Sequence, residues 1–467
     1  MKRWALALPL LVLSALFVLR LAGPADILDK DQPRPIEYIV DALANGQWIM
    51  QRDAGGSIAS KPPLYTWLAA LSTAIFGGSR FALYLPCAAA FACLTALATC
   101  WTARRLGWAA GLAAGMCLAL AFDTQKAIVL ARTDAVFAAC VALTAYAALR
   151  AWEGAGSWVR FWLAAALTTL AKTPVGVLFA SGGLLAAWWR GERPRAGAPA
   201  LGSQVLGLLL FLALTVGWLL LAVHALGQPV LDKLIGQELI RHATENDKGT
   251  PLWLTWWRPP LWYVGLFLPW SLAAGYALWR LWRRPPLVPR QRRFLRFMAC
   301  WLGVGLLILM LAPHKRLILG LPMLFPGAVL AGVGLSWLLR GWHPLRWAGA
   351  WLLASVLVLS GLWVYHQHRD RVKDQIAASE AVIATGGALS ALAARGIAVS
   401  WNGLPPCVRY FIAGMPPATS DPAAWLAQPG PQAVAVLEDR EVVGAALYLR
   451  PAPGFRIALD AEAAARR

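Results

Sequence analysis

The sequence predicts an all-α polytopic membrane protein with about eleven transmembrane helices and a small α/β domain at its C-terminal end. The 467 residues are 59% hydrophobic and include 26 tryptophans, which is more apolar surface than one core surrounded by water could bury. The apolar residues also gather in runs of roughly 20, the length that crosses a bilayer. From about Asp370 onward hydropathy falls, and short alternating elements replace the long apolar runs.

The apolar runs define a membrane-spanning domain, which we assign to residues 1–368. We expect its helices at residues 4–22, 80–103, 107–122, 133–151, 158–171, 174–190, 203–226, 259–280, 296–312, 316–339 and 345–365. The first run could also be a secretory signal, since Ala22-Gly23-Pro24-Ala25 is similar to a cleavage point. We prefer an uncleaved helix, because its length fits a tilted span and Arg20 can snorkel at its outer end.

The distribution of charge predicts the topology. A formal net charge of +20 on a soluble protein would suggest nucleic acid as a partner. Here the basic residues lie in short clusters between the apolar runs, so the positive-inside rule explains them and no nucleic-acid partner is expected. With the N-terminus in the cytoplasm, the cytoplasmic clusters are Arg104/Arg105, Arg150/Arg160, Arg190/Arg193/Arg195, the run 280–296 and Arg340/Arg346. This predicts a multi-pass protein of the cell inner membrane with a periplasmic C-terminal domain.

The first outer loop, residues 23–79, contains two predicted surface helices. Pro33 and Pro35 can open a helix whose apolar residues Ile36, Ile39, Val40 and Leu43 share one stripe. Lys61-Pro62-Pro63 opens a second helix, which Gly77-Gly78 ends. We expect both helices to lie on the membrane surface.

The C-terminal segment, residues 369–467, is predicted to be a small periplasmic α/β domain. Its pattern indicates a helix to about Arg395 and strands at 397–401, 433–437 and 446–449. Six of the seven cysteines lie in apolar runs and only Cys407 lies in a polar region. No disulfide framework or CxxC metal site is therefore indicated.

Charged residues beside the membrane mark the candidate site, because an unpaired charge at membrane depth is costly. Four clusters qualify: Asp29–Arg34 with Glu37; Lys61; Arg132-Thr133-Asp134 with Lys172; and His314-Lys315-Arg316. The predicted topology places all four on the outer side. Their convergence predicts one site at that face.

The motifs around these charges resemble those of a known family. They are Asp31-Gln32-Pro33-Arg34, Gly46–Trp48, Lys61–Leu68, Arg132–Ala135, Leu170–Gly176, Pro251-Leu252-Trp253, Leu268-Pro269-Trp270, and Lys315-Arg316 before Pro322. Over about residues 1–365 the chain resembles the GT-C glycosyltransferases of the protein O-mannosyltransferase and lipid A aminoarabinose transferase type. The resemblance implies a GT-C fold and transfer of a sugar from a polyprenyl-phosphate donor to a protein, lipid A, another envelope glycan or a small lipid.

The resemblance also assigns roles to residues. Asp31 matches the essential first-loop acidic residue, and a carboxylate can act there as the base for an acceptor hydroxyl. If the acceptor is a phosphate, no base is needed and Asp31 orients the sugar. Asp134 is the second catalytic candidate. The substrate-binding candidates are Arg34, Glu37, Lys61, Tyr65, Lys172, Arg241, Lys315 and Arg316; among them Lys61, Arg241, Lys315 and Arg316 are suited to hold the donor phosphate.

Two departures from the family pattern affect the metal and the second carboxylate. Ser60 stands where the aminoarabinose transferases often have a metal-binding Glu, so no cofactor is assigned. Glu238, Arg241, His242 and Asp247 keep a divalent metal or a sugar-binding role open, with Glu238 and His242 as the metal candidates. The family usually has two acidic residues side by side in the first loop. Here these positions are Asp31 and Gln32, so the second carboxylate is missing, and Asp29 is the candidate substitute for it.

Each candidate also has a purely structural interpretation. Asp31 and Arg34 could form a helix N-cap with a surface ion pair, and Asp134 could cap its helix beside Arg132. Lys61 could be a snorkelling anchor, and Lys172 could contact backbone carbonyls. His242 and His314 could be polar plugs, and Tyr65 an aromatic residue of the interfacial belt.

A membrane transporter or lipid flippase without covalent chemistry is the alternative from another class. It would favour charges at the bilayer midplane and inverted repeats. The sequence shows neither feature.

Overall fold

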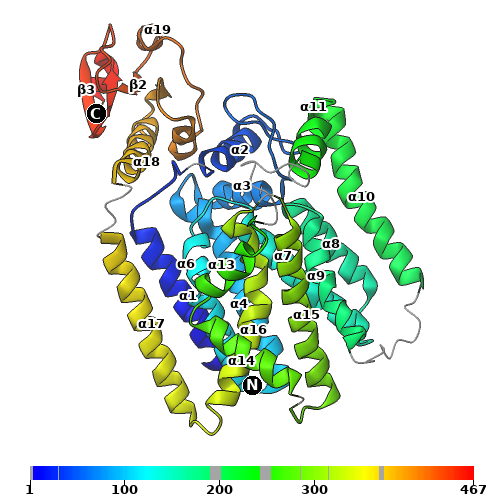
Figure 1. Ribbon diagram of the computed structural model, residues 1–467. Coiled ribbons are helices and arrows are strands. Elements are labelled where there is room, and N and C mark those ends of the chain that lie inside the picture. Colours follow the sequence, from blue (N-terminus) through cyan, green and yellow to red (C-terminus); the bar gives the residue numbers. More distant parts are fainter. Residues whose placement is uncertain are drawn as a thin grey trace. The chain divides into compact units, whose positions relative to one another are not determined.

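The computed structural model describes residues 4–29, 31–189, 201–241, 254–283, 285–313, 315–367 and 373–466, which form two compact units (Figure 1). The helical unit comprises Met1–Arg20, Ser60–Tyr65 and Cys87–Leu362. The loop unit comprises Leu21–Ala59, Thr66–Pro86 and Trp363–Arg467. Parts of the first outer loop thus share a unit with the C-terminal segment.

The described helices of the helical unit follow the predicted runs. They are α1 (Trp4–Ala22), α4 (Arg80–Leu106), α5 (Trp108–Ala119), α6 (Phe122–Ala127), α7 (Asp134–Trp152), α8 (Trp158–Ala171), α9 (Val175–Gly182), η1 (Gly183–Ala187), α10 (Leu201–Leu226), α11 (Pro229–Leu231), η3 (Asp232–Arg241), α13 (Arg258–Leu266), α14 (Trp270–Trp282), α15 (Pro289–Leu311), η5 (Leu317–Met323), α16 (Leu324–Leu338) and α17 (Pro344–Gln367). The outermost turns of α1, α4 and α17 belong to the loop unit.

Eight helices of the described chain are long and apolar enough to span a membrane. One of them, α18 (Lys373–Ala393), packs against all four strands of the C-terminal sheet, so we assign it to that sheet and not to the membrane. The other seven, the pair α13 and α14 with its 112° bend, and the short apolar helices α5, α8 and α9–η1 occupy the eleven predicted positions. The all-α membrane fold is confirmed.

Small residues bring the central helices of this unit close together. Helix α16 packs against α5, α14 and α15. A Cβ at Gly332 would lie 2.3 Å from the backbone nitrogen of Ala114, and one at Gly334 would lie 2.1 Å from the carbonyl oxygen of Ala273. The glycines therefore let neighbouring helix backbones approach more closely than any side chain would allow, which is typical of helix packing within membranes. By contrast, α10 and α17 leave most of their leucines exposed, as a lipid-facing helix does.

A buried ion pair fixes one end of the helical unit. The two guanidinium nitrogens of Arg105, at the end of α4, donate to the two carboxylate oxygens of Glu153 at 2.7 and 2.5 Å. Glu153 directly follows α7, and Gln291 in the first turn of α15 donates to the Arg105 carbonyl. The ends of three helices therefore meet where the topology predicts same-side connections. Which side of the membrane this is stays a prediction.

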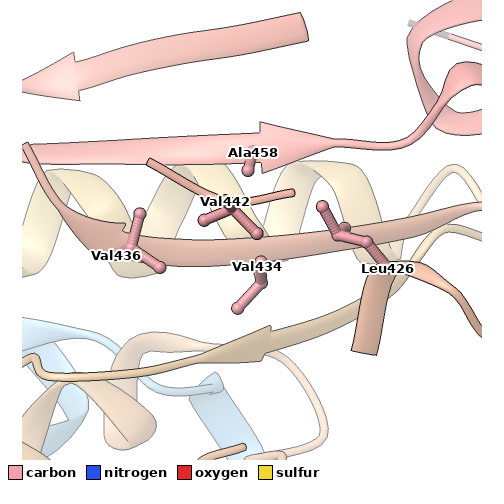
Figure 2. Close-up of a cluster of buried hydrophobic side chains, with 5 residues drawn as sticks. All are labelled: Leu426, Val434, Val436, Val442 and Ala458. Atoms are coloured by element: carbon pink, nitrogen blue, oxygen red, sulfur yellow. The ribbon is translucent and has the colours of Figure 1, made fainter. Parts of the chain in front are cut away.

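The loop unit combines surface helices with a four-stranded sheet. Its elements are α2 (Pro33–Ala44), α3 (Leu64–Phe76, from Thr66 onward), α18, β1 (Ala398–Trp401), η7 (Pro406–Phe411), α19 (Pro422–Leu426), β2 (Gln432–Leu437), β3 (Leu447–Ala452), β4 (Phe455–Leu459) and α20 (Ala461–Ala465). The strand order is β1-β2-β4-β3, with β1 parallel to β2 and the remaining pairs antiparallel. Figure 2 shows part of the core of this sheet, formed by Leu426, Val434, Val436, Val442 and Ala458. Strand β4 was not predicted.

The two helices of the first outer loop differ in what covers them. The apolar stripe of α2 is buried in protein, with Ile36 and Ile39 fully covered, and η7 packs against this helix. The apolar stripe of α2 therefore packs on the C-terminal segment, and the place of this helix on the membrane surface stays a prediction. In α3, Leu71 and Ile75 remain exposed on one stripe, as a surface helix requires.

Candidate active site

A buried carboxylate with two cations lies at the start of α7. Asp134 is the first residue of this helix, and its side chain is 6% exposed. The Lys172 ammonium donates to Asp134 Oδ1, and Arg132 Nε lies 3.3 Å from Oδ2. Lys172 follows the last turn of α8 with a non-helical backbone, since the Thr173-Pro174 step ends the helix there. The predicted helix break is thus present, and it aims Lys172 at a carboxylate.

A second ion pair joins the same group of charges. Lys61 donates to Glu238 on the π-helix η3. Burial lowers the pKa of Lys61, while the charge and hydrogen bond of Glu238 raise it; Lys172 lowers it further and Asp134 raises it. Lys61 thus lies close enough to Asp134 and Lys172 for their charges to act on it, and Arg132 joins them through its contact with Asp134. We call Lys61, Arg132, Asp134, Lys172 and Glu238 the Asp134 cluster.

The Asp134 cluster carries three cations and two carboxylates, which leaves a surplus of one positive charge. Asp134 itself is 6% exposed, while its four partners are partly open to solvent, from 12% for Lys172 to 32% for Lys61. A partly buried cluster with surplus positive charge suits an anionic group such as a phosphate. The sequence motifs predicted four of the five residues as members of one site. Glu238 was expected as a candidate for a metal or a sugar, and its ion pair with Lys61 is seen only in the structure.

A narrow pocket in the helical unit gathers further charges. Lys315 and Arg316 line it together with Asp123, Trp262 and Tyr263. The cavity is about 30 Å³, far smaller than the roughly 300 to 1,000 Å³ of a typical ligand pocket. Burial lowers the pKa of Lys315, and the nearby Arg258 acts in the same direction.

Asp123 in this pocket was missed by the sequence analysis. It lies in α6, directly after the apolar run predicted to end at residue 122. Burial raises the pKa of Asp123 to about 6, and the nearby Lys126 acts against this rise. The sequence did contain a signal for it, because Asp123 is an isolated acidic residue at the outer end of a predicted span.

The candidates of the first loop lie in the loop unit. Asp31 is exposed in a turn, and the N-cap of α2 is Gln32, so Asp31 does not cap this helix. Arg34 Nε is 3.9 Å from Asp53 Oδ2, with its side chain 68% exposed. Glu37 accepts a hydrogen bond from the Ala54 amide at 2.8 Å, and burial raises the pKa of its carboxyl. Arg34 and Glu37 therefore hold the turn at Asp53-Ala54.

Some predicted residues lie outside the described part of the chain. These are His242, Asp247, Pro251–Trp253, His314 and the side chain of Arg241. Tyr65 is described and is 1% exposed, so it is an interior residue and not part of an interfacial belt. Within the described residues no three His, Cys, Asp or Glu side chains are grouped so that they could hold a metal ion.

A helical membrane domain with a charged cluster at helix ends and a small C-terminal sheet is the arrangement expected of the GT-C fold. Comparison with known proteins agrees with this fold. Residues 60–220 match the family described as dolichyl-phosphate-mannose-protein mannosyltransferase. This stretch includes Lys61, Arg132, Asp134 and Lys172.

Solved structures share the fold of this chain. The chain is similar to ArnT from Cupriavidus metallidurans bound to undecaprenyl phosphate, with a TM-score of 0.64 and 16% identity, over 98% of this chain and 97% of that one. The apo state of the same ArnT gives a TM-score of 0.63 and 15% identity, over 97% of each chain. No curated protein matches the sequence significantly. The predicted GT-C resemblance and fold are confirmed.

Proposed function

We propose that the protein is an inverting glycosyltransferase that moves a sugar from a polyprenyl-phosphate donor to an acceptor at the periplasmic face of the inner membrane. The observation that carries the proposal is the Asp134 cluster, where charges from distant chain segments meet and leave a positive surplus. The matched family and the similar ArnT support the reaction class. In this orientation the N-terminus is cytoplasmic and the C-terminal segment, residues 369–467, is periplasmic.

The proposed reaction exchanges one bond at the anomeric carbon of the sugar. The acceptor oxygen attacks this carbon from the face opposite the phosphate, and the bond from the carbon to the phosphate oxygen breaks. The polyprenyl phosphate leaves with the electron pair, and the proton of an acceptor hydroxyl passes to a base. Attack from the opposite face inverts the anomeric configuration.

Cations suit the leaving group better than a general acid does, because polyprenyl phosphate departs as a stable anion. We assign this role to Lys61, with Arg132 and Lys172 adding positive potential around it. Asp134 holds Lys172 and Arg132 in place. Arg241, Lys315 and Arg316 remain proposed contacts for the phosphate and its lipid.

Asp31 is the proposed base, on the strength of its match to the first-loop acidic residue of the resembling transferases. If the acceptor is a phosphate, Asp31 orients the sugar instead. The acceptor is proposed to be an envelope glycan, lipid A, a lipid or a protein. Glu238 is engaged with Lys61, so we propose a role for it in tuning that lysine and not in binding a metal.

The test uses purified protein in detergent with a radiolabelled polyprenyl-phosphate sugar and envelope extracts as acceptors. We expect release of free polyprenyl phosphate only when acceptor is present, and an inverted anomeric centre in the product. A flippase would leave the donor intact. Comparing the masses of envelope lipids and glycoproteins with and without the gene identifies the acceptor.

The variant Asp31→Asn tests the proposed base. We expect it to reduce transfer to a hydroxyl acceptor by about 10²- to 10⁴-fold, the usual contribution of a general base. Because Asp31 is exposed, the abundance of the protein in the membrane should not change. Transfer at the wild-type rate by this variant would remove Asp31 from the mechanism.

A further inference from the structure

Helix α18 of the C-terminal segment is hydrogen bonded to the chain that leads to Asp31. Glu380 Oε1 accepts a hydrogen bond from the Ala25 amide at 2.6 Å, and Ser379 Oγ accepts one from the Leu28 amide at 3.3 Å. Gln375 Nε2 donates to the Asp26 carboxylate at 2.8 Å. Gln375 and Ser379 are one helical turn apart and share a face of α18, and Glu380 stands next to Ser379 at the edge of that face.

The segment that α18 holds has no helix or strand of its own to satisfy its amides. Ala25 and Ile27 are nevertheless almost completely buried. A buried amide without a partner is costly. The side chains of α18 therefore accept hydrogen bonds from the amides of this stretch, as backbone carbonyls would in a helix or a sheet.

The held segment continues directly into the turn that carries Asp31. The buried Gln32 side chain donates to the Asp26 carbonyl at 2.5 Å, and the Gln32 amide donates to the Asp29 carbonyl at 2.8 Å. Gln32 is thus tied back to Asp26 and Asp29, and the exposed Asp31 directly precedes it. The position of Asp26, which Gln375 holds, sets the position of this turn.

Arg80 adds a second contact between α18 and the same stretch of chain. Arg80, the first residue of α4, lies 3.7 Å from Glu380 and donates to the Gly23 carbonyl at 2.8 Å. Glu380 therefore connects two points of the chain before Asp31. Away from the loop, α18 packs against the C-terminal sheet, which keeps the helix from adjusting freely.

We propose that α18 positions the catalytic loop: Gln375, Ser379 and Glu380 hold residues 25–28 and thereby fix the turn that carries Asp31. The inference rests on the proposed role of Asp31. It gives the C-terminal segment a task in the reaction, although the segment contributes no group to the chemistry. These three are positioning residues, and their loss should act on kcat, because a displacement of about 1 Å at a reacting group can cost about 10²-fold in rate.

The experiment compares Glu380→Ala, Ser379→Ala and Gln375→Ala with Glu462→Ala in the full-length protein. Glu462 is a matched control, since it also forms an ion pair in the C-terminal segment, but with exposed Arg466. We expect kcat to fall about tenfold to hundredfold in Glu380→Ala and less in the other two, with KM for the donor within about twofold. Glu462→Ala should match the wild type.

Hydrogen exchange gives a readout that does not depend on activity. The amides of Ala25 and Leu28 should lose protection in Glu380→Ala and Ser379→Ala, respectively. Lost protection with an unchanged kcat would overturn the proposal, and so would unchanged protection.

A double-mutant cycle separates this proposal from the proposed base. In an Asp31→Glu background, which retains a carboxylate, adding Glu380→Ala should lower kcat by much less than it does in the wild type, because both changes act through one group. Fully additive effects would contradict positioning through Asp31. If Asp31→Asn retains transfer, the role of Asp31 fails instead, whereas the exchange measurement still reports whether α18 holds the loop.

Discussion

Two groups of paired charges flank helix α7, and they are built in opposite ways. Glu153, directly after the helix, forms two hydrogen bonds with one arginine, and the side chains of Arg105 and Glu153 are 3% and 7% exposed. Asp134, at the start of the helix, shares two cations, and its cluster is more open and has surplus positive charge. The first is a closed pair whose opposite charges cancel. The second is an open cluster in which positive charges outnumber negative ones by one.

The difference separates a structural ion pair from a candidate binding site. A closed bidentate pair satisfies both partners and leaves nothing for a ligand to bind. An open cluster with one excess cation is stabilised further by an added anion. Burial alone therefore does not identify the functional carboxylate; the local charge balance and the exposure of its partners do.

The largest expected effect on transfer is that of Asp134→Asn. Without the carboxylate, Lys172 and Arg132 lose the group that orients them, so we expect transfer to fall about 10²- to 10³-fold, as when a preorganised electrostatic group is lost. Lys172 and Arg132 are more exposed than Arg105 is, so the thermal unfolding temperature should change less than in the matched variant Glu153→Gln. A variant that unfolds readily but keeps its rate per folded molecule would show that Asp134 is as structural as Glu153.

The matched change at the other end of α7, Glu153→Gln, should act on stability. It leaves the Arg105 guanidinium buried without its counter-charge, which typically costs about 3 to 5 kcal/mol. We expect a clearly lower unfolding temperature in detergent and transfer per folded molecule within about twofold of the wild type. If Glu153→Gln lost transfer without losing stability, Glu153 would not be a purely structural residue and the comparison with Asp134 would fail.

The smallest effect is a shift in the pH dependence of transfer in Glu238→Gln. Lys61 must be protonated to hold a phosphate, so transfer is lost as pH rises through its pKa. Burial lowers this pKa and Glu238 raises it, and removing the carboxylate therefore lowers it further. The alkaline loss of transfer should begin at lower pH than in the wild type, as measured by initial rates across a pH series.

Exposed Asp232 on the same π-helix is the matched control. The variant Asp232→Asn should leave the pH profile unchanged. A shift in the opposite direction in Glu238→Gln, or the same shift in both variants, would show that Glu238 does not tune Lys61.

The sequence predicted the helices well because each is a local property. A run of apolar residues specifies a span without reference to the rest of the chain, and a break such as Lys172-Thr173-Pro174 specifies its end. The motif residues Lys61, Asp134 and Lys172 were predicted as one site for a related reason: the topology follows from the basic clusters between spans.

Partnerships between distant segments were not predictable in this way. The burial of α2 by η7, the pairing of Lys61 with Glu238, and the contact of Glu380 with Ala25 each join segments more than 170 residues apart. Strand β4 was not predicted because its apolar stretch, Phe455–Leu459, is short, and its strand conformation depends on pairing with β2 and β3.

By itself, the sequence determined that this chain crosses a membrane many times, where its spans lie and which charges stand between them. Lipid is a uniform solvent, so a helix placed in it is specified residue by residue. Only the tertiary structure decided which charge meets which, and it placed the C-terminal segment on the first outer loop. Hydrogen bonds and ion pairs depend on distances of about 3 Å, and those distances are set by the whole fold.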